Sequence, residues 1–497
     1  MSSRSQSSEG RELPQNDSGT LAPEEQQSEK QEKRPDSDDH LVSLDPSEDP
    51  LRFSSLKKWL AVAVIAMGSF CVTCASSMAS FTEAGMAAEF HVPHEPTILS
   101  ISLFVLGLGC GPLITGPFSE VYGRAIIYRV SYILLVVLSF PVVFAPNLAV
   151  VLVFRFLLGA AGASFLSVAG GSIADMFSGP KVATPMACYT ISPFLGPVFG
   201  PLIGGFINQH LNWRWTYRIL IIWTFAEMVA IFLFVPESYA PVLLKRKAQK
   251  MRKGTGDQAY WAPLDRRDTT LTRSLLLSCY VPFKLLFFER MALLLDTWNA
   301  LLLGILYLMF QAFPIIFEDV HHFNVQSTGA SFLGIGVGMG IGLATQPFWN
   351  RLAAKAAAEH GGKAPPETLL IMGQVGGVLV PLSLYWFAFT TYPHVHWIVP
   401  ILASVPFGCG VFFVFTATFT YLVTAYRPIA ASAMAANSFL RSAFAAAFPL
   451  FAGAMYQKLG TVGATALLAG LTTLMAPLPF IFYRIGPRLR ARSKFAV

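Results

Sequence analysis

The sequence has few charged residues for its length. Asp, Glu, Lys and Arg make up 13% of the 497 residues, whereas hydrophobic residues make up 54%. About 25% of the residues in soluble domains are charged, so this composition excludes a soluble globular protein and indicates a chain that crosses a membrane repeatedly. We therefore take the net charge of +7 as a sign of membrane topology and expect no nucleic-acid partner.

The sequence also lacks motifs that several classes of enzyme require. It has no Gly-x-x-x-x-Gly-Lys-Ser/Thr loop for nucleotide phosphates, so no ATP hydrolysis is expected and uphill work must draw on an ion gradient. No soluble segment is available to hold a catalytic triad or a pair of carboxylates. We expect no enzymatic activity and no cofactor, with a proton gradient as the energy source.

Cysteine is scarce as well. Five of the six cysteines lie in apolar runs, where they are expected as small buried residues. The pair Cys71-x-x-Cys74 has no further Cys or His nearby in the sequence. We therefore expect no metal or redox site.

Apolar runs long enough to cross a bilayer recur along the chain, each of about 20 residues or slightly more. Six lie in the first half of the sequence and six in the second. We predict an all-α integral membrane fold with twelve transmembrane helices in two six-helix halves. The predicted spans are residues 59–80, 97–119, 126–145, 148–171, 183–207, 216–236, 297–317, 329–348, 368–390, 396–422, 428–451 and 462–483.

The segments outside the spans differ in composition. The first 57 residues are rich in Ser, Glu, Gln and Asp and nearly free of aromatics, which predicts a disordered tail. The long basic connection between the halves ends in a mixture of Leu, Phe, Tyr and charged residues, as in an amphipathic helix at the membrane surface. The predicted parts are a tail (1–57), a first half (58–236), a linker (237–296), a second half (297–484) and a basic tail (485–497).

Basic residues gather on one side of the predicted spans. They precede the first span, follow the even-numbered spans and close the chain, whereas the other side carries mainly acids such as Glu83, Glu89 and Glu95. The positive-inside rule then places both termini in the cytoplasm. We expect the plasma membrane as the location, with the vacuolar membrane as the alternative.

Glycine and proline cluster in the predicted fifth span. Small residues at 196, 200 and 204 share one helix face, which lets a neighbouring helix approach closely, and the two prolines each remove a backbone donor and weaken the helix. The pattern predicts a bent helix that acts as a moving contact; the alternative is a tightly packed helix without a mechanical role. The residues are Gly196, Pro197, Gly200, Pro201, Gly204 and Gly205.

Four charged residues lie within or at the edge of the predicted spans, where a charge costs roughly 2.5 kcal/mol or more. They are Arg155, Glu227, Asp296 and Arg441. Glu227 lies near the middle of its span and is our first candidate for a proton-carrying carboxylate; the alternative is that it only neutralises an arginine. Asp296 is a further candidate, unless it merely favours the start of a helix.

A tight turn after the second predicted span carries an acid and a base four residues apart. In residues 116–124, Gly-Pro-Phe-Ser-Glu-Val-Tyr-Gly-Arg, Glu120 and Arg124 can close a charge cluster against the helix ends, which predicts a latch with two states. With Gly116 and Gly123, the segment resembles the motif between the second and third helices of the major facilitator superfamily. Glu120 replaces the usual Asp, and Ala125 stands where a second basic residue is common.

Further segments extend this resemblance. Arg155 opens an Arg-x-x-x-Gly motif, which implies a role in proton transfer, and residues 196–205 resemble the fifth-helix pattern of antiporters. Residues 213–215, 236–244 and 435–442 resemble the fungal twelve-helix drug:proton antiporters, and Asn437 and Arg441 become candidates for the cavity wall. The second copy of the latch, residues 346–351, keeps an arginine but no acid, so we expect an asymmetric inner gate held by Glu120 and Arg124.

The resemblance implies a proton-coupled antiporter that exports small amphipathic molecules such as a fungal secondary metabolite, a toxin or an antifungal drug. Its expected partners are that substrate and the lipid bilayer, and we expect a monomer. Alternatives are a transporter of polyamines or another nutrient, sugars included, and a non-transporting membrane receptor. Two arginines within the spans weigh against a polycationic cargo, and a receptor would require a substantial folded tail.

Overall fold

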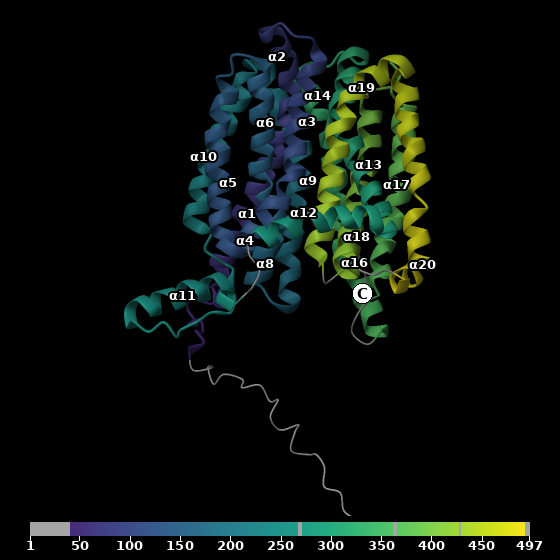
Figure 1. Ribbon diagram of the computed structural model, residues 1–497. Helices are drawn as coiled ribbons and strands as arrows, with labels where there is room; N and C mark the ends of the chain where they lie inside the picture. Colours follow the sequence, from purple (N-terminus) through teal and green to yellow (C-terminus); the bar gives the residue numbers. More distant parts are fainter. Residues whose placement is uncertain (1–39, 267–270, 361–364, 427–428, 493–497) are drawn as a thin grey trace, which may run out of the picture.

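Long apolar helices make up the computed structural model, which describes residues 40–266, 271–360, 365–426 and 429–492 (Figure 1). No strand forms within these ranges. In hydrocarbon only a helix or a closed barrel satisfies its own backbone hydrogen bonds, which explains why the apolar runs are helical. The first set of helices comprises α1 (Ser55–Ser77), η3 (Met78–Thr82), α2 (Glu83–Phe90), α3 (His94–Cys110), α4 (Pro112–Tyr122), α5 (Arg124–Val143), α6 (Leu148–Gly162), α7 (Ser164–Ser167), α8 (Ala169–Met176), η4 (Gly179–Val182), α9 (Ala183–His210) and α10 (Arg214–Phe234).

A connection and a second set of helices follow. The connection contains α11 (Ala240–Thr255), η5 (Pro263–Arg266) and α12 (Leu271–Phe288). The second set comprises α13 (Arg290–Phe313), η6 (Pro314–Val320), α14 (Val325–Ser331), α15 (Leu333–Ala344), α16 (Gln346–Glu359), η7 (Pro366–Leu369), α17 (Leu370–Ala388), α18 (Ile398–Ala425), α19 (Ala430–Met475) and α20 (Leu478–Arg492). In this arrangement α13 begins at residue 290, before the predicted start of the seventh span at residue 297.

The number of membrane crossings depends on two breaks. By length and hydropathy, ten helices of the described chain can cross a membrane, or eleven if α3 and α4, bent by 41°, form one span. The last candidate covers 62 residues, and a straight helix of that length would measure roughly 90 Å, about three times the hydrocarbon core. Gly460, with φ 71°, breaks α19, and the chain turns back there (Figure 1). Counting its two arms separately gives twelve.

Two hydrophobic clusters hold the helices together. One is built by residues of the first set, from Ala61 to Val235. The other is built mainly by the second set, and α3 and α9 reach into it through Ile101, Val105, Phe194 and Val198. The two sets therefore pack against each other along α3 and α9.

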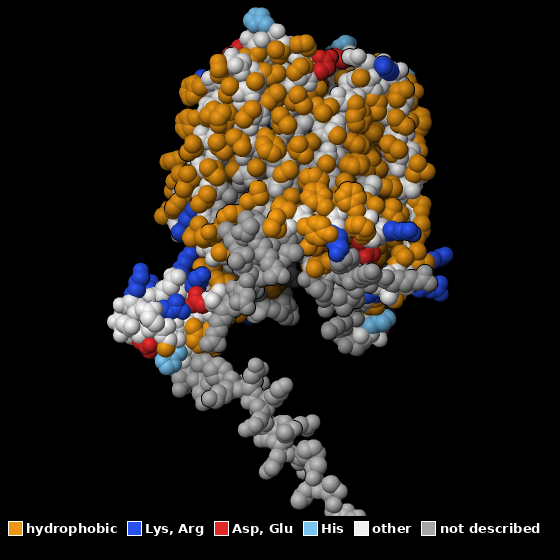
Figure 2. Space-filling model, in the orientation of Figure 1, with side chains coloured by type: hydrophobic (Ala, Val, Ile, Leu, Met, Phe, Trp, Pro, Cys, Tyr) orange, Lys and Arg blue, Asp and Glu red, His pale blue; other side chains and the backbone are white. Residues whose placement is uncertain are grey.

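A wide band of hydrophobic side chains covers the face of the molecule seen in Figure 2, and charged side chains lie at the two ends of this band. Large apolar side chains such as Ile222, Leu233 and Leu474 are 65–76% exposed, which is expected where lipid is the solvent. The chain is an integral membrane protein. Both ends of the described chain, together with α11, lie at one end of this band, which we call the terminal end; the opposite end is the far end (Figure 1).

The two predicted tails are partly described. Residues 1–39 and 493–497 lie outside the described residues. Before α1, the Val42 amide donates to the Trp261 carbonyl and Lys247 Nζ lies 2.7 Å from Asp45 Oδ2, which raises the pKa of Lys247. At the other end, α20 continues into the predicted basic tail. The described parts of both tails thus belong to helical or docked structure.

Candidate functional site

A large hollow lies between the two helix sets. It has a volume of about 1200 Å³. It is lined by residues of α1, α3, α4, α5, α7, α8 and α9 on one side and of α13, α15, α16, α17, α18 and α19 on the other. Glu120 and Asn350 line it at the terminal end, and Thr73 and Tyr307 line it deeper inside. Since both sets contribute, any movement of one set against the other changes its shape.

The wall of this cavity is mainly apolar and aromatic. Phe194 of α9 stacks on Phe415 and Phe419 of α18, with ring centroids 5.1 and 6.2 Å apart. Trp349 and Met372 add to the wall, and polar side chains such as Thr190, Asn437 and Arg441 lie between the apolar ones. Pockets of this kind bind molecules with flat apolar faces and use the few polar groups for orientation.

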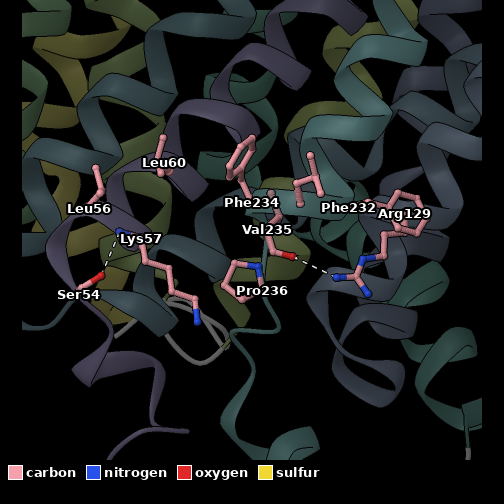
Figure 3. A pocket seen from close by; sticks show the side chains of 10 residues that line it. Ser54, Leu56, Lys57, Leu60, Arg129, Phe232, Phe234, Val235 and Pro236 are labelled. Atoms are coloured by element: carbon pink, nitrogen blue, oxygen red, sulfur yellow. Dashed lines mark hydrogen bonds between the residues drawn. The ribbon is translucent and has the colours of Figure 1, made fainter.

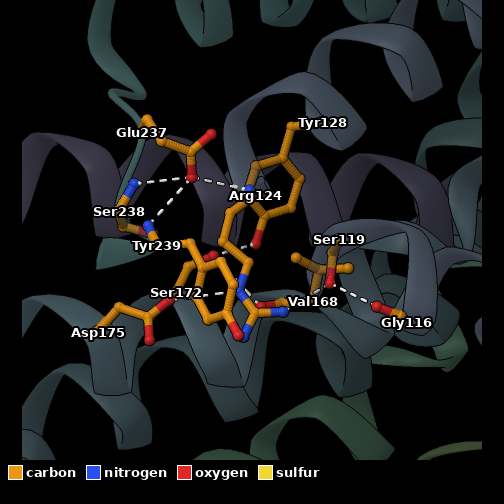
Figure 4. Close-up of polar contacts among 10 residues, drawn as sticks. All are labelled: Gly116, Ser119, Arg124, Tyr128, Val168, Ser172, Asp175, Glu237, Ser238 and Tyr239. Carbon is orange, nitrogen blue, oxygen red and sulfur yellow. Dashed lines mark hydrogen bonds and ion pairs between the residues drawn. The ribbon is translucent and has the colours of Figure 1, made fainter. Parts of the chain in front are cut away.

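Arg124 is the centre of a charge cluster at the terminal end (Figure 4). Its Nε lies 3.3 Å from Asp175 Oδ2 of α8, and its Nη1 donates to Ser119 Oγ of α4. The backbone amide of Arg124 donates to Glu237 Oε1 at 2.8 Å, and the same oxygen accepts from the amide of Tyr239. The cluster joins α4, α5 and α8 of the first set with the start of the connection.

Glu120, the predicted partner of Arg124, lies apart from this cluster. It is exposed on α4, lines the cavity and makes no hydrogen bond or ion pair with any residue that the structure describes. Asp175 and Glu237, which the sequence analysis did not single out, bind Arg124 instead. The signal for Glu237 was its place in the segment 236–244, directly after the sixth span and on the side of Arg124. The latch role of Glu120 stays a prediction.

The two glycines of the latch motif differ in their surroundings. Gly123 has φ 102°, a backbone conformation that favours glycine, and a Cβ there would overlap the Glu237 carboxylate. Gly116 has open space around its Cα, and its carbonyl accepts from Ser119 Oγ at 2.7 Å. Of the two, Gly123 alone is required as glycine for the Arg124 cluster to form.

The small face of α9 lies against α1. A Cβ at Gly196 or Gly200 would overlap the hydroxyls of Thr73 and Ser77, and one at Gly204 would lie 3.0 Å from the Met78 carbonyl. Ser77 Oγ donates to the Gly196 carbonyl at 3.1 Å. The sequence pattern and the close approach of two backbones thus coincide.

The other face of α9 contacts the second set at the far end. A Cβ at Gly205 would lie 2.8 Å from the Val325 carbonyl, and one at Gly329 would overlap the Pro201 carbonyl. Pro197, one turn earlier, lines the cavity. Helix α9 therefore closes the far end with one part and bounds the cavity with another.

Arg155 is buried in the first set and is held by carbonyl groups. Its guanidinium donates to the carbonyls of Ser100 and Ala75 at 2.9 Å and of Ser76 at 3.3 Å, and it lies 4.2 Å from the Phe104 ring centroid. It makes no ion pair with an acid in the described parts of the chain. Its charge therefore ties α6 to α1 and α3.

Glu227 is buried in α10, with 6% of its surface exposed. Its Oε1 has no hydrogen-bond partner among the described residues. It does not line the central cavity, and the structure pairs it with neither Arg155 nor Arg218. The carboxylate is therefore buried beside the first set's core, away from the substrate-sized space.

Asp296 lies with both cavity candidates of α19. It is fully buried in the second turn of α13, and Asn437 Nδ2 donates to its Oδ1 at 2.9 Å. Asn437 and Arg441 both line the cavity, and the Arg441 guanidinium lies 5.1 Å from the Phe419 ring centroid. Since α13 begins at Arg290, Asp296 does not mark the start of a helix.

Several polar atoms around Asp296 lack a partner. Its Oδ2, the Asn437 Oδ1 and both amide atoms of the buried Asn299, one turn further along α13, have no hydrogen bond in the described structure. Buried polar atoms are nearly always bonded in folded proteins. These unpaired polar atoms lie next to Asn437, which lines the cavity.

A second hollow of about 460 Å³ lies at the outer surface of the first set, near the terminal end (Figure 3). Lys57 at the start of α1, Arg129 of α5 and Phe232 of α10 line it, and Arg129 Nη2 donates to the Val235 carbonyl at 3.4 Å. It shares no lining residue with the central cavity. It is therefore a separate surface feature.

A membrane-spanning helical bundle with a deep cavity between two packed sets, and with charged groups beside that cavity, defines a membrane transporter. The chain belongs to the Major Facilitator Superfamily, whose family model matches residues 65–449.

Curated relatives match almost the whole chain. "Efflux pump atB" of Aspergillus terreus is 46% identical over 467 residues, which cover 92% of this chain and 90% of the relative. "Probable drug/proton antiporter YHK8" of Saccharomyces cerevisiae is 39% identical over 91% of this chain and 88% of the relative. "Citrinin biosynthesis cluster MFS transporter mrr1" of Monascus ruber is 37% identical over 92% of this chain and 93% of the relative.

Solved structures support the fold. The human organic anion transporter MFSD10 aligns with a TM-score of 0.59 at 16% identity and covers 85% of this chain and 99% of its own. A mutant of the peptide transporter POT aligns with a TM-score of 0.62 at 15% identity, and the alignment covers 90% of this chain and 99% of the transporter. At these identities the likeness concerns the fold alone.

Proposed function

We propose that this protein is a proton-coupled exporter of small amphipathic organic molecules. The observation that carries the proposal is the cavity with aromatic side chains that both helix sets line. The carboxylate of Asp296 lies directly behind its wall and accepts a hydrogen bond from Asn437, which lines the cavity. Relatives named as an efflux pump and as a drug/proton antiporter support the same function.

In the proposed orientation, the protein lies in the plasma membrane and its terminal end faces the cytoplasm. Lys57, Arg124 and Arg351 lie at that end, as the positive-inside rule requires. The cavity is bounded by residues of the terminal end, whereas α9 and α14 touch at the far end. The structure then corresponds to a state that receives cargo from the cytoplasm, and movement of one set against the other would release it outside.

We place the coupling proton first at Asp296. Its partner Asn437 lines the cavity, so a change of charge at Asp296 is felt by bound cargo through one amide group. Glu227, the first candidate from the sequence, is also buried but lies away from the cavity wall. We keep it as the second candidate, with a proton site in the first set as its role.

The proposal is tested by export from cells with and without the protein. A panel of fluorescent aromatic compounds and polyamines is loaded, and accumulation is measured with and without an uncoupler. We expect lower accumulation of the aromatic compounds, abolished by the uncoupler. Accumulation that is lower for polyamines alone would favour the nutrient alternative, and no difference for any compound would contradict export.

The variant Asp296→Asn locates the proton. It keeps the size of the side chain and its contact with Asn437 but cannot be charged, so we expect uncoupler-sensitive export to fall by at least tenfold while cargo binding persists. Asp319→Asn, at an exposed acid of the far end, is the matched control and should export normally. Normal export by Asp296→Asn together with loss in Glu227→Gln would move the proton to Glu227.

A further inference from the structure

One buried carboxylate lies outside the site described above. Glu83, the first residue of α2, is 2% exposed and lies at the far end, where the two helix sets meet. Its Oε1 and Oε2 accept from Nε2 of Gln311 in α13 at 3.0 and 2.9 Å. The sequence analysis placed Glu83 among the acids on the side opposite the basic residues; in the structure it accepts a hydrogen bond that joins the two sets.

A half-exposed histidine connects this carboxylate with the surface. Nε2 of His94, at the start of α3, lies 3.3 Å from Glu83 Oε2, and the His94 side chain is 51% exposed. An imidazole takes up and releases protons near neutral pH. It is therefore placed to pass protons between the solution at the far end and the buried carboxylate.

Closing the far end buries this carboxylate against an uncharged partner. The Gln311 amide is 8% exposed and carries no charge, whereas a buried carboxylate without a cation is strongly disfavoured. The amide can donate to an ionised carboxylate or accept from a protonated one, so the hydrogen bond itself survives protonation. The free energy of closing the far end therefore depends on whether Glu83 is protonated, and it is lower when Glu83 is neutral.

Among the charges near Glu83 in the described structure, only that of a protonated His94 can offset this cost. Glu89 of the same helix is paired with Arg214 of α10. The start of α2 favours an anion, but this effect is smaller than the cost of burying a charge. Titratable groups on the surrounding elements include His94 and Glu95 of α3, Tyr217 and Arg218 of α10, Tyr307 of α13, and Glu318 and Asp319 of η6. In the described structure, His94 alone lies within ion-pair distance of Glu83.

We propose that Glu83 is a proton-binding site of the outer gate, reached through His94, and that binding of a proton from the outside closes this gate. This inference rests on the proposed function for the orientation of the far end. The direction of this proton effect suits an exporter. After cargo is released, protons from the outside close the outer gate and so favour the return to the state that is open to the cytoplasm.

A thiol reporter tests the gate independently of transport. Ala79, fully buried in η3 one turn before Glu83, packs in the cluster of the second set, so Ala79→Cys should react with a membrane-impermeant thiol reagent only when the far end opens. The rate is divided by that of Leu211→Cys, an exposed position at the same end, which removes the effect of pH on thiol reactivity. The chain without either added cysteine gives the background.

We expect the relative rate to fall as the outside pH falls from about 8 to about 5, by at most tenfold per pH unit for one proton. Glu83→Gln should give a low rate at every pH. Gln311→Glu, which places two carboxylates together, should move the midpoint to higher pH. His94→Gln should leave the relative rates at high and at low pH unchanged, but it should slow the change between them after a pH jump.

Two outcomes would overturn the inference: a rate without pH dependence in the parent chain, or an unchanged pH dependence in Glu83→Gln. Surface expression of each variant, measured by an epitope tag, separates these outcomes from loss of folding. Failure of the proposed function is recognised differently, because export would then persist after addition of an uncoupler whatever the reporter shows.

Discussion

At the scale of single residues, the cluster around Arg124 differs from what sequence spacing alone predicts. Glu120 and Arg124 are four residues apart, but Gly123 ends the helix between them and turns Arg124 toward Asp175 and Glu237. A motif specifies which residues are present. The backbone conformation of one glycine decides which of them meet.

We predict that Asp175→Asn slows export more than Glu120→Ala does. The first change removes the ion pair of Arg124 with α8, whereas the second removes an exposed side chain without a described partner. The measurement is the initial rate of uncoupler-sensitive export at equal surface expression, and we expect a severalfold reduction for Asp175→Asn. A larger effect of Glu120→Ala would show that Glu120 forms the latch in another state of the cycle.

At the scale of helices, the pairing of α1 with α9 depends on glycine. Gly200 leaves no space for a Cβ beside Ser77, and forcing atoms into a packed contact costs about 1–3 kcal/mol. We predict that Gly200→Ala lowers the melting temperature of the detergent-solubilised protein and reduces export.

Gly470→Ala is the matched control for this change. Gly470 also lies in a long helix, α19, but has open space around its Cα, so alanine should stabilise it by up to about 1 kcal/mol through helix propensity. Equal melting temperatures for both variants would show that the contact between α1 and α9 can accommodate a methyl group at residue 200 without loss of stability.

The helices themselves could be predicted well from the sequence, because the apolar runs leave the backbone no alternative in a membrane. The close contact along Gly196 and Gly200 was equally accessible, since small residues four apart share a face. The positions that escaped prediction were Glu83, Asp175 and Asn299. Their partners lie on helices distant in sequence, and no local pattern marks a polar residue whose environment is created only by the packing of other helices.

At the scale of the whole molecule, transport by relative movement of the two sets requires the far end to open. His210 of α9 and Gln326 of α14 lie across this contact, with His210 Nε2 3.4 Å from Gln326 Oε1. We predict that a cleavable thiol cross-linker between His210→Cys and Gln326→Cys stops export.

Cleavage of the linker should restore export, and each single-cysteine variant treated in the same way should remain active. The measurement is again uncoupler-sensitive export, with cross-linking followed by gel mobility after proteolysis in the connection. Undiminished export by the fully cross-linked protein would contradict a cycle in which α9 and α14 separate.

The connection between the sets has a consequence for the size of the cargo. Its helices α11 and α12 comprise 16 and 18 residues, so they reach roughly 50 Å instead of about 110 Å for an extended chain of that length. Helix α12 packs on α4 of one set and α19 of the other. We expect this folded, shortened link to limit how far the two sets can separate at the terminal end, and therefore to limit the size of the cargo that enters there.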